Sequence, residues 1–170
     1  VDIRHDLHAH PELGYQETRT SEVIKRELRN SGVSFIENLA GGTGVLGHIK
    51  GKGSETVGLR ADIDALPIIE VNTFDYKSVH EGCMHACGHD LHTCIGLGVA
   101  KILAKNKFTT ARIRIIFQPA EEIAQGANWM RAEKVLEGIE ALFGVHVYPD
   151  LQIGSNQQEA LSQQRKKSSI

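Results

Sequence analysis

Helix-like and strand-like segments alternate along most of this chain, and this alternation constrains its fold more than any other feature. Apolar residues recur at helical spacing in three segments, residues 3–31, 91–105 and 127–136. Short runs rich in β-branched and aromatic residues predict four strands, at residues 45–49, 56–59, 112–117 and 141–147. Strands that alternate with helices are typical of α/β sandwiches, so we predict one built around a mainly parallel sheet.

Turn and helix-breaking residues refine these boundaries. Pro11 should divide the first helical segment in two, because proline lacks a backbone donor and disfavours helix in the residue before it. We expect residues 45–49 and 56–59 to form a hairpin, and residues 60–67 to be a loop at a strand end. The helix at residues 91–105 is so apolar that we expect it to be buried.

Composition and charge narrow the class of protein. At 170 residues, with 41% hydrophobic and 24% charged residues, the chain resembles one globular domain. Its net charge of −2 gives no reason to expect nucleic acid or an anionic membrane as a partner. No apolar run approaches the roughly 20 residues that a membrane span needs. The three cysteines are an odd number, which predicts reduced thiols in a cytoplasmic protein.

Residues 85–92 contain three histidines, a cysteine and an aspartate, which are common ligands of borderline-soft divalent metals. Gly88 favours an irregular turn before the following helix, so we expect Cys87 and His89 to point the same way and bind metal. A structural zinc site would need a second closely spaced pair of Cys or His ligands, which the sequence lacks. The other polar residues are expected to support the site or to be structural: His85, Asp90 and His92.

More polar residues follow other predicted strands. Neighbouring side chains of an extended segment point to opposite sides, so one of Glu121 and Glu122 could bind metal while the other holds a water. His146 lies within the last apolar strand, where a lone histidine is often a core residue. Asp62 and Asp64 share a face of an extended segment, although such residues also form turns and caps. Because sites in these sheets form at the carboxyl ends of strands, we expect all these groups to meet there.

Other residues with ligand chemistry lie elsewhere in the sequence. His5, His8 and His10 form a stripe near the start of the chain, but their charged neighbours predict exposed side chains. Cys94 lies in an apolar, glycine-rich run, and we expect it to be a buried and unreactive thiol. None of these four residues is therefore placed in the predicted site.

Six segments, taken together and in this order, resemble the metal-dependent amidohydrolases. This family includes the N-acyl-amino-acid, hippurate and auxin-conjugate hydrolases and the N-acetyl-diaminopimelate deacetylases, within the aminoacylase and carboxypeptidase clan. The segments are RHDLHAHPELGYQE, GGTGVLG, LRADIDALPI, MHACGHDLHT, IFQPAEE and FGVHVYP. The resemblance extends from about His5 to Gly154 and implies a zinc-exopeptidase-like three-layer α/β sandwich with a mainly parallel mixed sheet.

The resemblance also implies roles for individual residues. Cys87 resembles a metal-bridging thiolate, and the further ligands implied are His89, Glu122 and His146. Glu121 resembles the general base that takes a proton from a metal-activated water. Family members use two divalent ions, and the mixed donors here do not choose among manganese, zinc and cobalt. The implied reaction is hydrolysis of the amide bond of an N-acyl amino acid or a similar conjugate.

The resemblance covers only part of the family's length. Residues 1–154 resemble the N-terminal part of the catalytic domain, and residues 155–170 form a polar tail that we expect to be disordered. We expect the inserted dimerisation domain and the C-terminal catalytic part, which in the family supplies a last ligand histidine, to be absent from this sequence. We therefore expect a truncated sheet, and a homodimer only with the missing domain.

Two other functions remain as alternatives. The chain could be an inactive fragment that binds metal weakly or serves only as an interaction module. It could instead be a thiol enzyme that uses Cys87 with a nearby histidine. Paired glutamates after a strand have no place in a cysteine–histidine mechanism, which argues against this second alternative.

Overall fold

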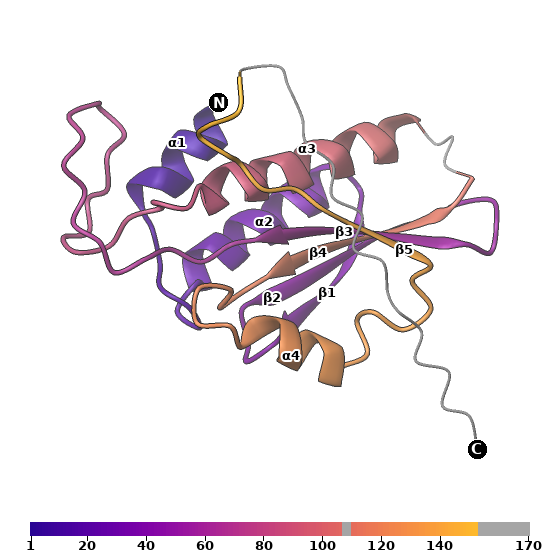
Figure 1. The fold of residues 1–170 in the computed structure, drawn as a ribbon. Helices are drawn as coiled ribbons and strands as arrows, with labels where there is room; N and C mark the ends of the chain where they lie inside the picture. Colours follow the sequence, from indigo (N-terminus) through magenta and orange to yellow (C-terminus); the bar gives the residue numbers. More distant parts are fainter. Residues whose placement is uncertain (107–109, 153–170) are drawn as a thin grey trace.

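Helices cover both faces of a five-stranded sheet in the computed structural model, which describes residues 1–106 and 110–152 (Figure 1). The strands are β1 (Ser34–Leu39), β2 (Gly44–Ile49), β3 (Thr56–Asp62), β4 (Arg112–Gln118) and β5 (Ala141–Gly144). The helices are α1 (Asp2–Ala9), α2 (Thr18–Asn30), α3 (His89–Asn106) and α4 (Gly126–Ala132). Helices α1, α2 and α3 lie on one side of the sheet and α4 lies on the other (Figure 1). The predicted three-layer α/β sandwich is thus confirmed; the predicted tail at residues 155–170 lies outside the described residues.

The sheet is mixed and has the strand order β1-β2-β4-β3-β5. Strand β3 pairs in parallel with β4 and β5, whereas β2 pairs antiparallel with β1 and β4. The predicted hairpin between residues 45–49 and 56–59 is wrong, because β2 pairs with β1 and β3 lies between β4 and β5. Strand β1 was not predicted, since its mostly exposed side chains show no regular alternation. The ladder between β3 and β4 continues to Asp62 opposite Gln118, so residues 60–62 are strand and not loop.

Two apolar clusters pack against opposite faces of this sheet. The larger cluster lies under α2 and α3 and includes Ile24, Leu28, Val45, Ile63, Leu97, Ile115 and Phe117. The smaller cluster lies under α4 and consists of Ala40, Leu46, Ile116, Met130 and Val135. Successive side chains of a strand point to opposite faces, so Ile115 and Ile116 belong to different clusters. The two layers of helices are therefore attached to the sheet by separate sets of strand residues.

Helix α3 is buried on one side only. A Cβ on Gly96 would come within 2.9 Å of the Phe117 ring, so the inner side of the helix packs tightly on the sheet. On the outer side, Leu91, Ile95 and Ile102 are 37%, 37% and 59% exposed. The prediction that this helix is buried therefore holds for its inner face alone. In the described part of the chain, no helix combines the length and the apolar character that crossing a membrane requires.

The helix boundaries follow from local chemistry. The predicted break at Pro11 is confirmed, because α1 and α2 lie on either side of it. Glu12 stabilises the start of α2, since its carboxylate accepts hydrogen bonds from the backbone N–H groups of Arg19 at 2.9 Å and Thr20 at 2.7 Å. Helix α4 ends at Ala132, earlier than its apolar pattern predicted.

His8 is buried, which contradicts the prediction that the histidines within residues 5–10 are exposed. Its Nδ1 lies 2.8 Å from Asp90 Oδ2, and its Nε2 lies 3.0 Å from Glu70 Oε1. Arg4 donates from Nε to the same Asp90 oxygen at 2.8 Å. These groups form a buried ion network that fastens α1 to the beginning of α3. The charged neighbours of His8 in sequence predicted an exposed side chain. Its partner Asp90 is distant along the chain, so local sequence could not reveal the contact.

Replacing His8 with Gln should destabilise the chain more at pH 6 than at pH 9. The hydrogen bond to Asp90 raises the pKa of His8 above its ordinary 6.5, although burial opposes this. Protonated His8 therefore stabilises the fold below that ordinary value, and this stabilisation is lost as the pH rises through the folded-state pKa. We expect a loss of about 2 kcal/mol at pH 6 and a smaller loss at pH 9 from urea unfolding. Equal losses at the two pH values would contradict this assignment.

Candidate metal centre

Four polar segments meet at the edge of the sheet where β3, β4 and β5 end. Asp62 ends β3 beside Gln118 at the end of β4, and α3 begins at His89. Strand β5 ends at Gly144, so His146 lies just beyond this strand and not within it as predicted. The structure thus brings together the segments whose meeting was predicted from the order of the elements.

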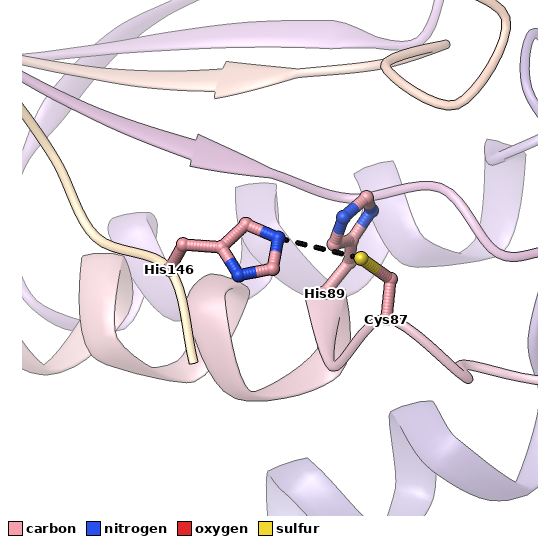
Figure 2. Close-up of side chains that lie close together, drawn as sticks. All are labelled: Cys87, His89 and His146. Carbon is pink, nitrogen blue, oxygen red and sulfur yellow. Dashed lines mark hydrogen bonds between the residues drawn. The ribbon is translucent and has the colours of Figure 1, made fainter. Parts of the chain in front are cut away.

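Cys87, His89 and His146 direct their ligand atoms toward one another (Figure 2). The Cys87 sulfur and one ring nitrogen of each histidine all lie within 4.8 Å of one another, and Cys87 Sγ is 3.3 Å from His146 Nε2. Gly88 permits the turn between the first two, because its φ is +84° and a Cβ there would come within 2.5 Å of Val147 Cγ2. These are the sulfur and nitrogen donors that a borderline-soft divalent ion takes.

His89 is oriented so that one ring nitrogen faces the carboxylates. Its Nδ1 lies 2.9 Å from the Asp64 backbone oxygen and 3.2 Å from Asp64 Oδ1, so Nδ1 carries the hydrogen. Its Nε2 lies 3.7 Å from Glu122 Oε1 and 3.8 Å from Glu121 Oε2. Within the described residues, His89 Nε2 and Glu122 Oε1 are both buried without a hydrogen-bond partner. Unpaired buried atoms are destabilising, and a divalent ion between these two would pair both, so the residues fit a metal.

Glu121 and Glu122 lie in a turn and not in the extended segment that was predicted. Ala120 before them has a φ of +52°, and the Ala124 N–H donates to the Glu121 carbonyl at 2.8 Å. Both carboxylates consequently approach His89 instead of pointing to opposite sides. The Glu121 side chain is 36% exposed and that of Glu122 only 19%, so Glu121 is the more accessible to water.

Asp64 fixes two of the candidate ligands at once. Its Oδ1 accepts the hydrogen bond from His89, and its Oδ2 accepts one from the Glu122 backbone N–H at 3.0 Å. Carboxylates that hydrogen-bond a ligand histidine in this way set its ring orientation and tautomer. The geometry places Asp64 behind the candidate ligands.

Asp62 belongs to a chain of polar contacts that the sequence predicts only in part. It accepts a hydrogen bond from His92 Nδ1, and Arg60 Nη1 lies 2.7 Å from its other oxygen. Burial opposes ionisation, but this hydrogen bond and the charges of His89 and Arg60 keep the pKa of Asp62 below its ordinary value. His92 Nε2 then accepts the Val147 N–H at 2.9 Å, which fixes the segment that carries the last candidate ligand.

Arg60 and His92 could have been recognised only in part from the sequence. His92 follows His89 by three residues on a helix, a spacing that places both on one face. Arg60 lies two residues before Asp62 on a strand and therefore shares its face. Neither spacing reveals that Arg60 Nη2 also approaches Glu121 Oε1, at 3.7 Å.

His85 and Asp90 do not join the group around His89. The Asp90 carboxylate instead pairs with Arg4 and His8 in the buried ion network. His85 is 3% exposed, and neither of its ring nitrogens has a partner among the described residues. Burial lowers the pKa of His85 to about 4, so its ring is neutral at pH 7. Both residues line a cavity of about 230 Å³ beside the candidate ligands.

Cys87 is a poor nucleophile in this environment. It lies close to His146, as a catalytic cysteine would, but burial and the neighbouring Glu122 and Glu121 raise the pKa of its thiol to about 11. Nucleophilic cysteines need a lowered pKa. A divalent ion supplies the positive charge that favours the thiolate, so the surroundings of Cys87 suit a metal ligand better than a thiol enzyme.

Fold and donor set define a class: an α/β domain with a candidate divalent-metal centre at its strand ends. The chain belongs to peptidase family M20/M25/M40, whose family model matches residues 58–158. The resemblance to metal-dependent hydrolases of the carboxypeptidase clan is thereby confirmed.

Curated relatives match nearly all of the chain. It is 43% identical over 157 residues to the N-acetylcysteine deacetylase of Bacillus subtilis, covering 91% of the chain and 41% of the relative. It is 44% identical over 155 residues to IAA-amino acid hydrolase ILR1-like 5 of Arabidopsis thaliana, covering 91% of the chain and 35% of the relative. The chain therefore spans about two-fifths of the length of these relatives.

Solved structures agree with the fold. A dinuclear metal binding peptidase from the M20 family of Bacillus subtilis superposes with a TM-score of 0.87 at 43% identity, covering 90% of this chain and 44% of that one. A putative aminohydrolase from methicillin-resistant Staphylococcus aureus gives a TM-score of 0.83 at 40% identity, covering 89% and 41%.

Proposed function

We propose that this chain carries the metal-binding part of a hydrolase that cleaves the amide bond of N-acyl amino acids or similar conjugates. The observation that carries the proposal is a pair of buried atoms, His89 Nε2 and Glu122 Oε1, that lie 3.7 Å apart beside Cys87 and His146. Neither atom has a hydrogen-bond partner among the residues that the structure describes. We place residues 1–154 in the first part of the catalytic domain. Such a convergence of donor atoms does not favour an inactive remnant.

The ligands in this proposal are Cys87, His89, Glu122 and His146. Divalent ions bound by them would polarise an amide carbonyl and lower the pKa of a water. A relative of the same family is described as a dinuclear metal binding peptidase, which supports two ions here. Sulfur, nitrogen and oxygen donors together are compatible with manganese, zinc or cobalt.

Glu121 is the general base in this proposal. Its carboxylate lies 3.8 Å from His89 Nε2 and is partly exposed, so it lies beside the candidate ligands and is accessible to water. Glu121 takes a proton from the attacking water and delivers it to the nitrogen of the departing amine. Arg60, at 3.7 Å from its other oxygen, orients the carboxylate. Asp64 and Asp62 keep the ligands in place from behind.

The substrate class follows from the names of the relatives. A deacetylase of N-acetylcysteine and a hydrolase of IAA-amino acids both act on an amide between an acyl group and an amino acid. We propose the same bond for this protein. We also propose no nucleic acid or membrane partner, because the net charge is only −2. A homodimer through the family's inserted domain and a cytoplasmic location complete the proposal.

A chimera tests the proposed function. Residues 1–154 would replace the matching segment of the Bacillus subtilis N-acetylcysteine deacetylase, to which the chain is 43% identical. We expect the chimera to release cysteine from N-acetylcysteine, and we expect EDTA to abolish this activity and manganese or zinc to restore it. A folded, metal-loaded chimera without activity would contradict the proposal, as would activity that survives EDTA.

A further inference from the structure

Glu17 is a buried carboxylate that the proposed mechanism does not use. It is 0% exposed and lies directly before α2, in the segment HPELGYQE. One of its oxygens accepts a hydrogen bond from Thr43 Oγ1 at 2.8 Å, and the other accepts one from the Ala120 backbone N–H at 2.9 Å. Glu17 thus joins three segments that are distant in sequence.

Ala120, whose backbone N–H donates to Glu17, lies at the start of the turn that carries Glu121 and Glu122. Ala120 is fully buried, and its φ of +52° is a conformation that residues other than glycine rarely adopt. Its carbonyl accepts hydrogen bonds from the N–H groups of Gln125 at 3.2 Å and Gly126 at 3.1 Å. Strained backbone of this kind persists only where its surroundings fix it. The carboxylate of Glu17 supplies one such restraint on the N–H side.

Packing brings the Glu17 segment against the same turn. A Cβ added at Gly14 would come within 3.1 Å of Ala120 Cα, so the backbone before α2 lies in close contact with this residue. Burial raises the pKa of Glu17, whereas the hydrogen bonds from Thr43 and Ala120 lower it, and burial prevails. A carboxylate in such surroundings is destabilising unless its hydrogen bonds are made, so the contact with Ala120 is specific.

We propose that Glu17 is a positioning residue, which holds Ala120 so that the carboxylates of Glu121 and Glu122 face His89. This inference rests on the proposed function, because it takes Glu121 as the base and Glu122 as a metal ligand. Glu121 and Glu122 directly follow Ala120 in the sequence, and their carboxylates approach His89 Nε2 at 3.8 and 3.7 Å. Small displacements of the turn would therefore change the distance of both carboxylates from His89 Nε2.

The experiment is a titration of the metal-free chain with Co²⁺, which measures the affinity for the ion. The thiolate-to-cobalt charge-transfer band shows in the same titration whether Cys87 binds it. Glu17→Ala should weaken the affinity by about 10- to 100-fold, the usual effect of losing an outer partner of a metal site. The charge-transfer band should persist at saturation, because Cys87 lies just before α3 and not on this turn. Glu17→Gln should bind Co²⁺ nearly as the unchanged chain does, since its amide can accept from Ala120 and donate to Thr43.

Two further variants separate positioning from folding. Ile24→Val removes part of a buried side chain from α2, the helix that follows Glu17, and should leave Co²⁺ affinity unchanged. Glu17→Asp keeps the charge but is one methylene too short to reach both partners, so it should weaken Co²⁺ binding. This variant tests the positioning role if Glu17→Ala does not fold. Unchanged affinity in folded Glu17→Ala or Glu17→Asp would overturn the role of Glu17 and leave the metal centre intact. Absence of Co²⁺ binding by the unchanged chain would overturn the proposed function and this inference with it.

Discussion

Replacing Cys87 with Ala is expected to weaken binding of Zn²⁺ by more than about 100-fold. This effect is larger than that of losing a residue that only hydrogen-bonds a metal ligand. Cys87 supplies the soft donor of the centre and lies 3.3 Å from His146 Nε2, so its loss removes a ligand and leaves that histidine without its neighbour. Competition titration against a chelating dye measures the change in affinity.

Cys94→Ala is the matched control for this experiment. Cys94 is a free cysteine on α3 and is half-buried, not buried as the sequence predicted. Among the described residues, its thiol is not one of the groups that converge on His89. Its replacement should leave Zn²⁺ affinity unchanged. If Cys87→Ala bound Zn²⁺ as tightly as Cys94→Ala does, the role of Cys87 as a ligand would be refuted.

Replacing Glu121 with Gln in the deacetylase chimera should lower kcat by about 100- to 10,000-fold, the range that general acid–base catalysis contributes. Glutamine keeps the size of the side chain but cannot take a proton from water. Metal content should not change, because Glu121 is not one of the proposed ligands. Steady-state hydrolysis of N-acetylcysteine and elemental analysis of the same samples measure the two effects.

The neighbouring residue provides the contrast. Glu122→Gln should lower metal affinity, because the carboxylate oxygen that faces His89 Nε2 at 3.7 Å becomes part of a neutral amide. The two glutamates are adjacent and similar. Loss of turnover with retained metal in Glu121→Gln, together with loss of metal in Glu122→Gln, would therefore separate their roles. Metal loss in Glu121→Gln with metal retention in Glu122→Gln would show that the two assignments are reversed.

The meeting of Asp62, Cys87, Glu121 and His146 could be predicted from the order of helices and strands. In a sheet with parallel strands, side chains that follow different strands arrive at one edge whatever the details of the loops. Backbone conformation within those loops could not be predicted in the same way. The positive φ of Ala120 turns both glutamates toward His89, whereas an extended segment would have separated them.

Long-range polar contacts are the part of the structure that local patterns do not encode. Charged neighbours predicted an exposed His8, but its partner Asp90 lies 82 residues away. The bond from Ala120 to Glu17 spans 103 residues. Strand β1 was missed for a related reason: an exposed edge strand needs no apolar alternation, since pairing with β2 satisfies its backbone.

The central claim is that Cys87, His89, Glu122 and His146 form a divalent-metal centre. The number of ions retained per chain tests it most directly, by elemental mass spectrometry after dialysis against manganese or zinc and then against metal-free buffer. The account predicts at least one tightly retained ion per chain, and two if the dinuclear centre described for its relative assembles on these residues. A folded chain that retains no ion would contradict it.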